Sequence, residues 1–168
     1  VFERAVVDHA VTQTAPGHVL AGSGLWPSQS GIIANEWFDR SLGRAVKAGE
    51  TIPGQPRVAL RWFVGRSLAE RIHAACPESR VVSLSIKDRG ALLFGGPGQD
   101  EACWWDFGSK RFVCYRGTPA WVKRFNRDAP ALGREAMGTA RGDALLERLA
   151  EAAVEAWDLG GRPGGPPD

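Results

Sequence analysis

The chain has 168 residues and a nearly balanced charge, with 21 lysines and arginines against 19 aspartates and glutamates, a formal net charge of +2. This balance argues against a nucleic acid or an anionic membrane as the main partner, because both select for clustered basic residues. The sequence has no apolar run near the ~20 residues that span a bilayer. It also does not open with a basic and apolar leader, so we expect any export signal to lie outside this chain.

The first third of the chain predicts short elements joined by loops. Residues 1–14 alternate loosely and end in a polar run, which indicates a strand leading into a loop. Small and apolar residues predict a short buried helix over residues 17–24. Residues 31–40 are too short and too aromatic for a helix and are expected to be extended or a tight turn. Glycine and proline predict a loop over residues 48–57.

The middle of the chain carries clearer signals. Ser67 and Glu70 have the spacing of a capping box and predict a helix over residues 67–76. The β-branched and apolar residues 80–86 predict a buried strand of a parallel sheet. The carboxyl end of that strand delivers the charged residues 87–89. Open α/β sheets bind ligands at the carboxyl ends of their strands, so this end is a candidate site.

Residues 102–115 predict a β-hairpin that folds about a two-residue type II′ turn beginning at Gly108. This register places Cys103 opposite Cys114. The two cysteines could pair in an oxidising compartment, but a two-residue turn would make them a hydrogen-bonded pair with the wider Cα spacing. The sequence therefore leaves the disulfide open.

The last third predicts two helices. Thr118 and Pro119 suit the N-cap and first position of a short helix over residues 120–126. Apolar residues at helical spacing predict a longer helix over residues 143–157. Glycine and proline exclude regular structure over residues 160–168.

Two polar residues stand where they could handle a phosphoryl group. Thr14 comes directly before a predicted helix, whose free N–H groups and positive dipole end would stabilise an alkoxide and an adjacent anion. The alternative is an ordinary helix cap or turn threonine. The Asn35 amide can donate to a developing negative charge. The alternative is a turn residue, since asparagine tolerates left-handed backbone.

Lys87 and Arg89 form a stronger pair. If strand geometry continues, alternate side chains point the same way, so the two cations converge on one anion while Asp88 points away. The alternative is a solvated charge cluster in a loop. The glycine-rich residues 95–98 lack the ending of a phosphate loop and predict a turn. The histidines have no metal-ligand spacing and are expected to be structural: His9, His18 and His73.

Four segments taken together resemble a known family. They are similar to the alkaline phosphatase superfamily, in particular to the type I phosphodiesterase/nucleotide pyrophosphatase family and its periplasmic alkaline phosphatases with a threonine nucleophile. The match covers about the first three quarters of the chain, and four motifs in the right order are far more specific than any one. The segments are residues 12–18, 24–27, 31–40 and 83–89.

This resemblance implies a fold and a domain boundary. Residues 1–159 would form a partial alkaline-phosphatase-like α/β sandwich, incomplete at both ends, with a mostly parallel central sheet and a β-hairpin insertion. Residues 160–168 would be a glycine- and proline-rich loop or a truncated end.

The resemblance also implies a site. Thr14 matches the nucleophile that forms a phosphothreonine and contacts one of two Zn²⁺ ions, and Asn35 matches the amide that holds a phosphoryl oxygen. Lys87 and Arg89 match the cationic pair of the monoesterase branch. That pair favours phosphomonoesters, because a monoester dianion leaves more negative oxygen to neutralise than a diester does. The expected ligand is a phosphomonoester or inorganic phosphate, with no nucleic acid or membrane partner.

The aspartate and histidine ligands of the two zinc ions have no counterparts in this sequence. We therefore expect a fragment of a zinc-dependent phosphomonoesterase that is inactive alone and does not hold the ions stably. The resemblance places the parent protein in the periplasm or outside the cell. Alternatives are a phosphodiesterase or nucleotide pyrophosphatase, a non-catalytic phosphate-binding module, or an incomplete chain that aggregates through exposed apolar surface.

Overall fold

A three-stranded sheet lies at the centre of the molecule, in the computed structural model that describes residues 10–160. Its order is β3-β4-β5, with β3 parallel to β4 and β4 antiparallel to β5. The strand bounds are Val82–Ser85 for β3, Glu101–Asp106 for β4 and Arg111–Cys114 for β5. The α/β class and the parallel strand predicted over residues 80–86 are confirmed, and the sheet of the described residues is mixed.

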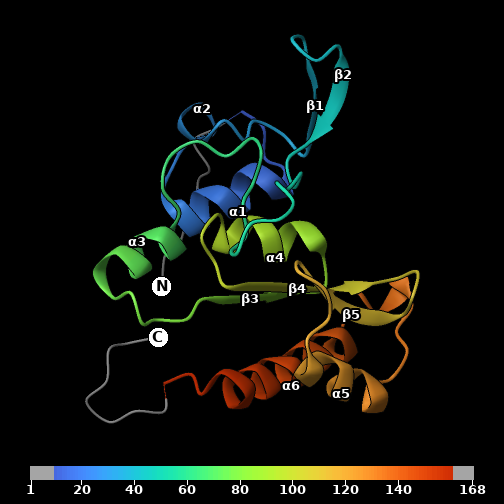
Figure 1. Cartoon of the computed structure of the whole chain (residues 1–168). Coiled ribbons are helices and arrows are strands. Elements are labelled where there is room, and N and C mark those ends of the chain that lie inside the picture. The colour runs from blue at the N-terminus through green and yellow to red at the C-terminus, as the bar shows by residue number, and fades with distance from the viewer. Residues whose placement is uncertain (1–9, 161–168) are drawn as a thin grey trace, which may run out of the picture.

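Helices cover both faces of this sheet (Figure 1). One layer holds α1 and α4, and the other holds α5 and α6, which lie on the opposite side of the strands. The helix bounds are Thr14–Ser23 for α1, Asp88–Gly95 for α4, Ala120–Asp128 for α5 and Ala140–Trp157 for α6.

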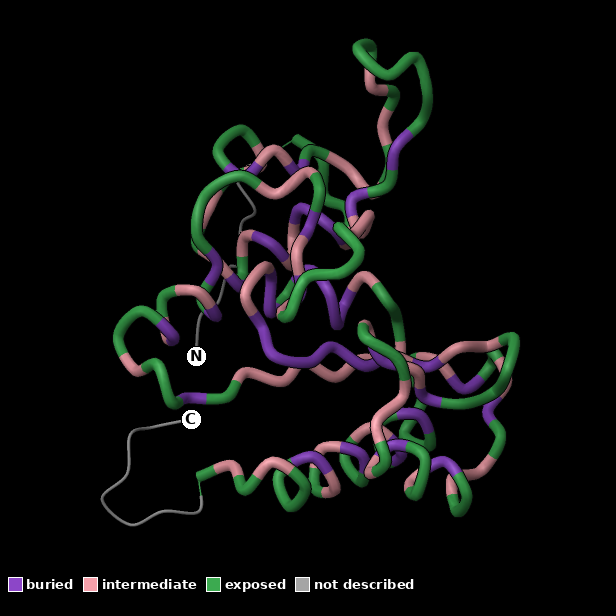
Figure 2. Tube along the Cα trace, in the orientation of Figure 1, coloured by how far each residue is buried: buried purple, intermediate pink, exposed green. Residues whose placement is uncertain are grey.

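The two layers have separate cores because side chains of β4 alternate between the faces of the sheet. Ala102 packs with apolar residues of α1 and α4, whereas Cys103 and Trp105 pack with Leu145 and Leu149 of α6. Figure 2 shows the buried residues running along β4 and the inner sides of α1 and α4. The apolar stripe predicted over residues 143–157 is therefore the buried face of a helix that begins a little earlier, after the N-cap Thr139.

Short elements connect and flank the layers. The β1–β2 hairpin projects away from the body in Figure 1, and most of its outer part is exposed in Figure 2. The predicted Ser67–Glu70 capping box is confirmed at the start of α3. The bounds are Pro27–Ser30 for α2, Glu36–Asp39 for β1, Arg44–Lys47 for β2, Leu68–Ala75 for α3 and Arg134–Ala136 for the 3₁₀ helix η1.

Several predicted boundaries need correction. The helix expected over 17–24 ends before Gly24 as predicted but already begins at Thr14. The helix expected after Thr118 is capped by Pro119 instead. The strand expected over 1–14 falls mostly outside the described residues, and Val11–Gln13 are neither helix nor strand. Most of residues 160–168 also lies outside them, so that domain boundary stays a prediction.

The helix α4 is the largest correction, because the strand geometry expected to continue through Arg89 ends at Ser85. The chain turns into a helix at Asp88, with Lys87 as its N-cap in extended conformation. Ala91, Leu92 and Leu93 of this helix pack in the same core as Ala102 of the sheet.

The hairpin register predicted from Cys103 and Cys114 is confirmed, but its turn is not of type II′. The turn spans four residues, and its left-handed position is Lys110 and not Gly108. With this longer turn the two cysteines form a close pair, with a Cα–Cα distance of 4.0 Å, and they are joined by a disulfide.

The helices α1 and α4 touch through their backbones. A Cβ on Gly22 would lie 1.8 Å from the carbonyl oxygen of Phe94, and a Cβ on Gly90 would lie 3.7 Å from Nε2 of His18. The two contacts are one helical turn apart in both helices, so α1 and α4 run in the same direction and in register. Glycine is required at position 22 because any side chain there would push the helices apart.

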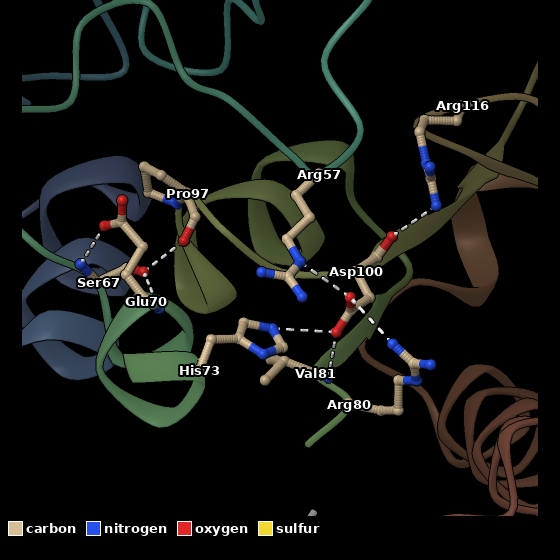
Figure 3. A network of polar contacts seen from close by, with 9 residues as sticks. All are labelled: Arg57, Ser67, Glu70, His73, Arg80, Val81, Pro97, Asp100 and Arg116. Atoms are coloured by element: carbon tan, nitrogen blue, oxygen red, sulfur yellow. Dashed lines mark hydrogen bonds and ion pairs between the residues drawn. The ribbon is translucent and has the colours of Figure 1, made fainter. Parts of the chain in front are cut away.

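Asp100 joins four segments at the opposite, amino-terminal edge of β3 and β4 (Figure 3). Its carboxylate is 8% exposed, accepts hydrogen bonds from Arg57 Nε at 3.1 Å and from the Val81 N–H at 2.9 Å, and lies 3.1 Å from Nε2 of His73. Arg80 lies 3.9 Å from the same carboxylate. A buried carboxylate with this many donors fixes the loop, α3 and β3 against β4.

We predict that Gly22→Ala lowers the free energy of unfolding by about 2 kcal/mol or more, because the added methyl group overpacks the α1–α4 contact. Gly17→Ala, in the same helix but with open space around it, should raise stability by about 0.5 to 1 kcal/mol. Urea denaturation followed by circular dichroism measures both. Equal stabilities for the two variants would show that the helices do not meet as described.

We also predict that Asp100→Asn lowers the free energy of unfolding by about 2 to 3 kcal/mol, because buried donors lose a charged acceptor. Glu78→Gln, an exposed substitution in the same region, should change stability by less than about 0.5 kcal/mol. Thermal melts of both variants at neutral pH test the difference. An Asp100→Asn variant as stable as Glu78→Gln would show that the charge of this carboxylate does not stabilise the fold.

Candidate functional site

Thr14 is the first residue of α1 and does not cap it. The N-cap is Gln13, whose side chain makes no capping hydrogen bond. Thr14 is half-buried, and its hydroxyl makes no hydrogen bond within the part of the chain that the structure describes. The capping alternative for this threonine is therefore wrong, and Thr14 stands at the positive dipole end of α1.

Two hydrogen bonds on either side of Thr14 attach Asn35 to it. The N–H of Ala15 donates to Oδ1 of Asn35 at 2.8 Å, and the N–H of Asn35 donates to Oε1 of Gln13 at 2.7 Å. Because Oδ1 is occupied, the Asn35 amide is oriented with its NH₂ group available as a donor. The structure thus brings together Thr14 and Asn35 as predicted, and it adds Gln13, which no local pattern in the sequence singled out.

The β1–β2 hairpin that follows Asn35 is fixed at its base. The N–H of Ala48 donates to the carbonyl of Asn35 at 3.0 Å. Close by, the guanidinium of Arg44 forms a bidentate pair with Glu50, at 3.0 and 3.1 Å. This pair, followed by a hydrogen bond from the Lys47 N–H, lowers the pKa of Glu50 to about 2. The returning strand is therefore held beside Asn35.

Lys87 and Arg89 lie at the N-terminus of α4, not on a continuing strand. Lys87 is the exposed N-cap residue, and Arg89 is half-buried in the first turn. The buried Nε of Arg89 has no hydrogen-bond partner in the described part of the chain. Asp88 accepts a hydrogen bond from the N–H of Arg89 at 2.7 Å, so its carboxylate is used within the turn.

The register of α1 and α4 relates these two groups of residues. Gly22 lies against Phe94 and His18 against Gly90, so one further turn back places Thr14 level with residue 86. Both helix N-termini therefore lie at the carboxyl edge of β3, as Figure 1 shows. Two positive dipole ends, two cations and the Asn35 amide at one edge form an arrangement suited to an anionic ligand.

The described residues do not supply a zinc site at this edge. Of the two described histidines, His18 is the one beside Thr14, and its Nδ1 lies 2.8 Å from the Thr14 carbonyl oxygen. Among residues 10–160 one cluster combines three metal-type ligands, Glu101 with Cys103 and Cys114, but both of its sulfurs form the disulfide. The burial of Glu101 raises its pKa, which further disfavours it as an anionic ligand.

Of the other histidines, one lies elsewhere and one is outside the described residues. His73 lies against Asp100 at the opposite end of β3, in the structural role expected for it. His9 falls outside the described residues.

The sequence pattern of one protein family, type I phosphodiesterase / nucleotide pyrophosphatase, matches residues 2–159. The chain belongs to this family, which is part of the alkaline phosphatase superfamily. No helix among residues 10–160 has the length and apolar character needed to cross a membrane.

Several curated relatives are alkaline phosphatases. The alkaline phosphatase PhoK of a Sphingomonas species is 38% identical over 126 residues, which cover 70% of this chain and 22% of that protein. PhoD of Zymomonas mobilis is 34% identical over 136 residues, covering 75% of this chain and 24% of that protein. The chain therefore spans about a quarter of the length of the curated relatives that it matches.

Solved structures of the alkaline phosphatase PafA share the fold. The wild-type structure gives a TM-score of 0.70 at 22% identity, covering 88% of this chain and 41% of that chain. A PafA variant with a threonine, an asparagine, a lysine and an arginine substituted gives 0.76 at 20% identity, covering 93% and 43%. At these identities the likeness shows the fold alone.

We predict that Arg44→Gln raises the pKa of Glu50 from about 2 towards the ordinary value of 4.5, because the bidentate Arg44 pair is the largest cause of its lowering. With a lowered pKa, Glu50 stabilises the hairpin above pH 4.5 and loses that effect as the pH falls towards 2. Carboxyl-detected NMR titration measures this pKa. Arg40→Gln, at the exposed end of the hairpin, should leave it unchanged, and a Glu50 pKa near 4.5 in the unsubstituted chain would contradict the pairing.

Proposed function

We propose that this chain supplies the phosphoryl-binding part of a phosphomonoesterase of the alkaline phosphatase type, with Thr14 as the covalent nucleophile. Asn35, Lys87 and Arg89 hold the non-bridging oxygens of the phosphoryl group. The observation that carries the proposal is the in-register contact of α1 and α4, which sets two helix N-termini and these side chains at one edge of the sheet.

The chemistry follows from the groups present. Oγ of Thr14 forms a bond to phosphorus while the bond from phosphorus to the ester oxygen breaks, and water later cleaves the phosphothreonine to release phosphate. Negative charge on the non-bridging oxygens meets the NH₂ group of Asn35 and the cations of Lys87 and Arg89. A phosphomonoester dianion gains more from two cations than a singly charged diester does, which favours monoesters.

The relatives support the same proposed function. The named curated relatives are alkaline phosphatases. In the PafA variant, the substituted threonine and asparagine are spaced as Thr14 and Asn35 are here, and the lysine and arginine are spaced as Lys87 and Arg89 are.

Activation of Thr14 requires a group that the described residues do not supply. No imidazole or carboxylate among them contacts the Thr14 hydroxyl, since His18 Nδ1 bonds to the Thr14 carbonyl. We infer that two Zn²⁺ ions provide this activation in the complete protein, with aspartate and histidine ligands from outside residues 10–160. The chain alone then binds phosphate without turning over. The Cys103–Cys114 disulfide supports a periplasmic or secreted protein.

Two other functions compete with this one. A phosphodiesterase or nucleotide pyrophosphatase of the same family would use the same nucleophile on a substrate whose phosphorus carries a second substituted oxygen. A non-catalytic phosphate-binding module is favoured by the absence of metal ligands around Thr14 among the described residues. Phosphate binding that persists with a metal chelator, combined with no hydrolysis by the complete protein, would support the module.

We predict that the complete protein with zinc hydrolyses 4-nitrophenyl phosphate faster than bis(4-nitrophenyl) phosphate. Thr14→Ala should lower kcat/KM for the monoester by about a thousandfold or more, because the nucleophile is lost. The double variant Lys87→Ala, Arg89→Ala should lower monoester hydrolysis far more than diester hydrolysis, because the cations neutralise the second charge.

Lys123→Ala, an exposed lysine on α5, is the matched control and should change neither rate. Full activity of Thr14→Ala would refute the nucleophile. If the complete protein prefers the diester, and still does so without Lys87 and Arg89, the phosphodiesterase is the better assignment.

A further inference from the structure

A depression of about 390 Å³ opens beside the proposed phosphate-binding cations. One wall is the start of α4, with Lys87 and Arg89, and the other is formed by Phe107 in the β4–β5 turn and Arg134 in η1. Lys87 and Arg89 belong to the layer of α1, whereas Phe107 packs with the core under α6. The depression therefore extends from the phosphate-binding edge towards the opposite layer of the molecule.

Arg134 is held in this depression by its surroundings. Its guanidinium carbon lies 5.1 Å from the centre of the Phe107 ring. The segment before it is anchored, because the indole N–H of Trp105 donates to the carbonyl of buried Leu132 at 3.3 Å. A guanidinium stacked on a ring keeps its in-plane N–H groups free, so Arg134 can offer a bidentate fork to an anion.

In the depression, the carboxylates accept backbone hydrogen bonds, whereas the cations have no carboxylate partner among the described residues. Asp106 accepts hydrogen bonds from the N–H groups of Gly108 and Ser109, at 3.2 and 2.9 Å, which lower its pKa after the larger effect of the Ser109 side chain. Asp88 is likewise bound to a backbone N–H. No carboxylate in the described part of the chain forms an ion pair with Lys87, Arg89 or Arg134.

Phosphoryl transfer gives this depression a defined place in the reaction. Attacking and leaving oxygens lie roughly in line through phosphorus. Thr14 begins α1, so in-line displacement would send the leaving group away from α1, towards the depression beside Lys87 and Arg89. Arg134 then faces whatever the leaving group carries.

We propose that Arg134 recognises a second anionic group, a carboxylate or a phosphate, on the leaving group of the phosphomonoester. Lys87 and Arg89 hold the phosphoryl group that is transferred, and Arg134 selects monoesters that bear a further negative charge a few bonds away. The proposal rests on the proposed function of Lys87 and Arg89.

The test compares ligands that differ in one added anionic group. Isothermal titration calorimetry of the chain, with a metal chelator present, measures the Kd of glycerol 3-phosphate, 3-phosphoglycerate and glycerol 1,3-bisphosphate. The second and third probes should bind about tenfold more tightly than the first, the effect of one charge-assisted contact. A gain confined to one of them distinguishes a carboxylate from a phosphate as the preferred second group.

The matched variants separate the roles. Arg134→Met keeps a stem over Phe107 and should abolish the tenfold gain while leaving glycerol 3-phosphate binding unchanged, and Arg134→Lys should keep part of the gain. Arg127→Met, on the exposed side of α5, should keep all of it. A thermal melt establishes that each variant folds.

The outcomes also separate this inference from the proposed function. If Lys87→Ala weakens binding of all three probes but Arg134→Met leaves their ratio unchanged, the phosphate site stands and the role of Arg134 is refuted. If Lys87→Ala has no effect on any probe, the proposed function fails and this inference fails with it.

Discussion

The contact between Gly22 and the Phe94 carbonyl is the constraint on which the candidate site depends. At this point the backbones of α1 and α4 approach more closely than any side chain would allow. The contact fixes both the distance between the helices and their register, and each helix begins at the same edge of the sheet. The proposed functional residues stand at or next to these two N-termini. A slip of one helix by one turn would therefore shift Thr14 by ~5 Å relative to Lys87.

The two edges of the sheet differ in how their polar groups are paired. At the amino-terminal edge of β3 and β4, the buried Asp100 carboxylate accepts hydrogen bonds from Arg57 and Val81 and lies beside His73 (Figure 3). At the carboxyl edge, Arg89 keeps a buried donor without a partner in the described residues, and the Asn35 amide keeps its NH₂ group free. Satisfied polar groups stabilise a fold, whereas unsatisfied ones beside a depression indicate a place for a ligand. This contrast supports placing the candidate site at the carboxyl edge of the sheet.

The sequence predicts well where the signal is local. The Ser67–Glu70 capping box, the β3 strand and the Cys103–Cys114 register follow from spacing alone, and all are confirmed. The residue pattern predicts secondary structure less well where tertiary contacts determine it. Residues 88–95 contain two glycines and give no clear helical signal, yet they form α4 because their apolar side chains cover the sheet.

The partners of the site residues could not be predicted from local patterns. The bonds that join Gln13, Ala15 and Asn35 link segments far apart in the sequence, and Asn35 alone indicates only a turn residue. The hairpin turn shows the same limit at short range. Gly108 suggests the left-handed position, but the carboxylate of Asp106 bonds the N–H groups of Gly108 and Ser109, and Lys110 takes that position instead.

Binding and chemistry are separable in this arrangement. Helix N-termini, an oriented amide and two cations suffice to attract a phosphate dianion, because each acts through its charge or dipole without changing its protonation state. Nucleophilic attack requires in addition that the Thr14 hydroxyl lose a proton, and none of the groups that surround it in residues 10–160 can accept one. On the proposal made above, the described residues bind the phosphoryl group, and the activation of Thr14 comes from groups outside residues 10–160.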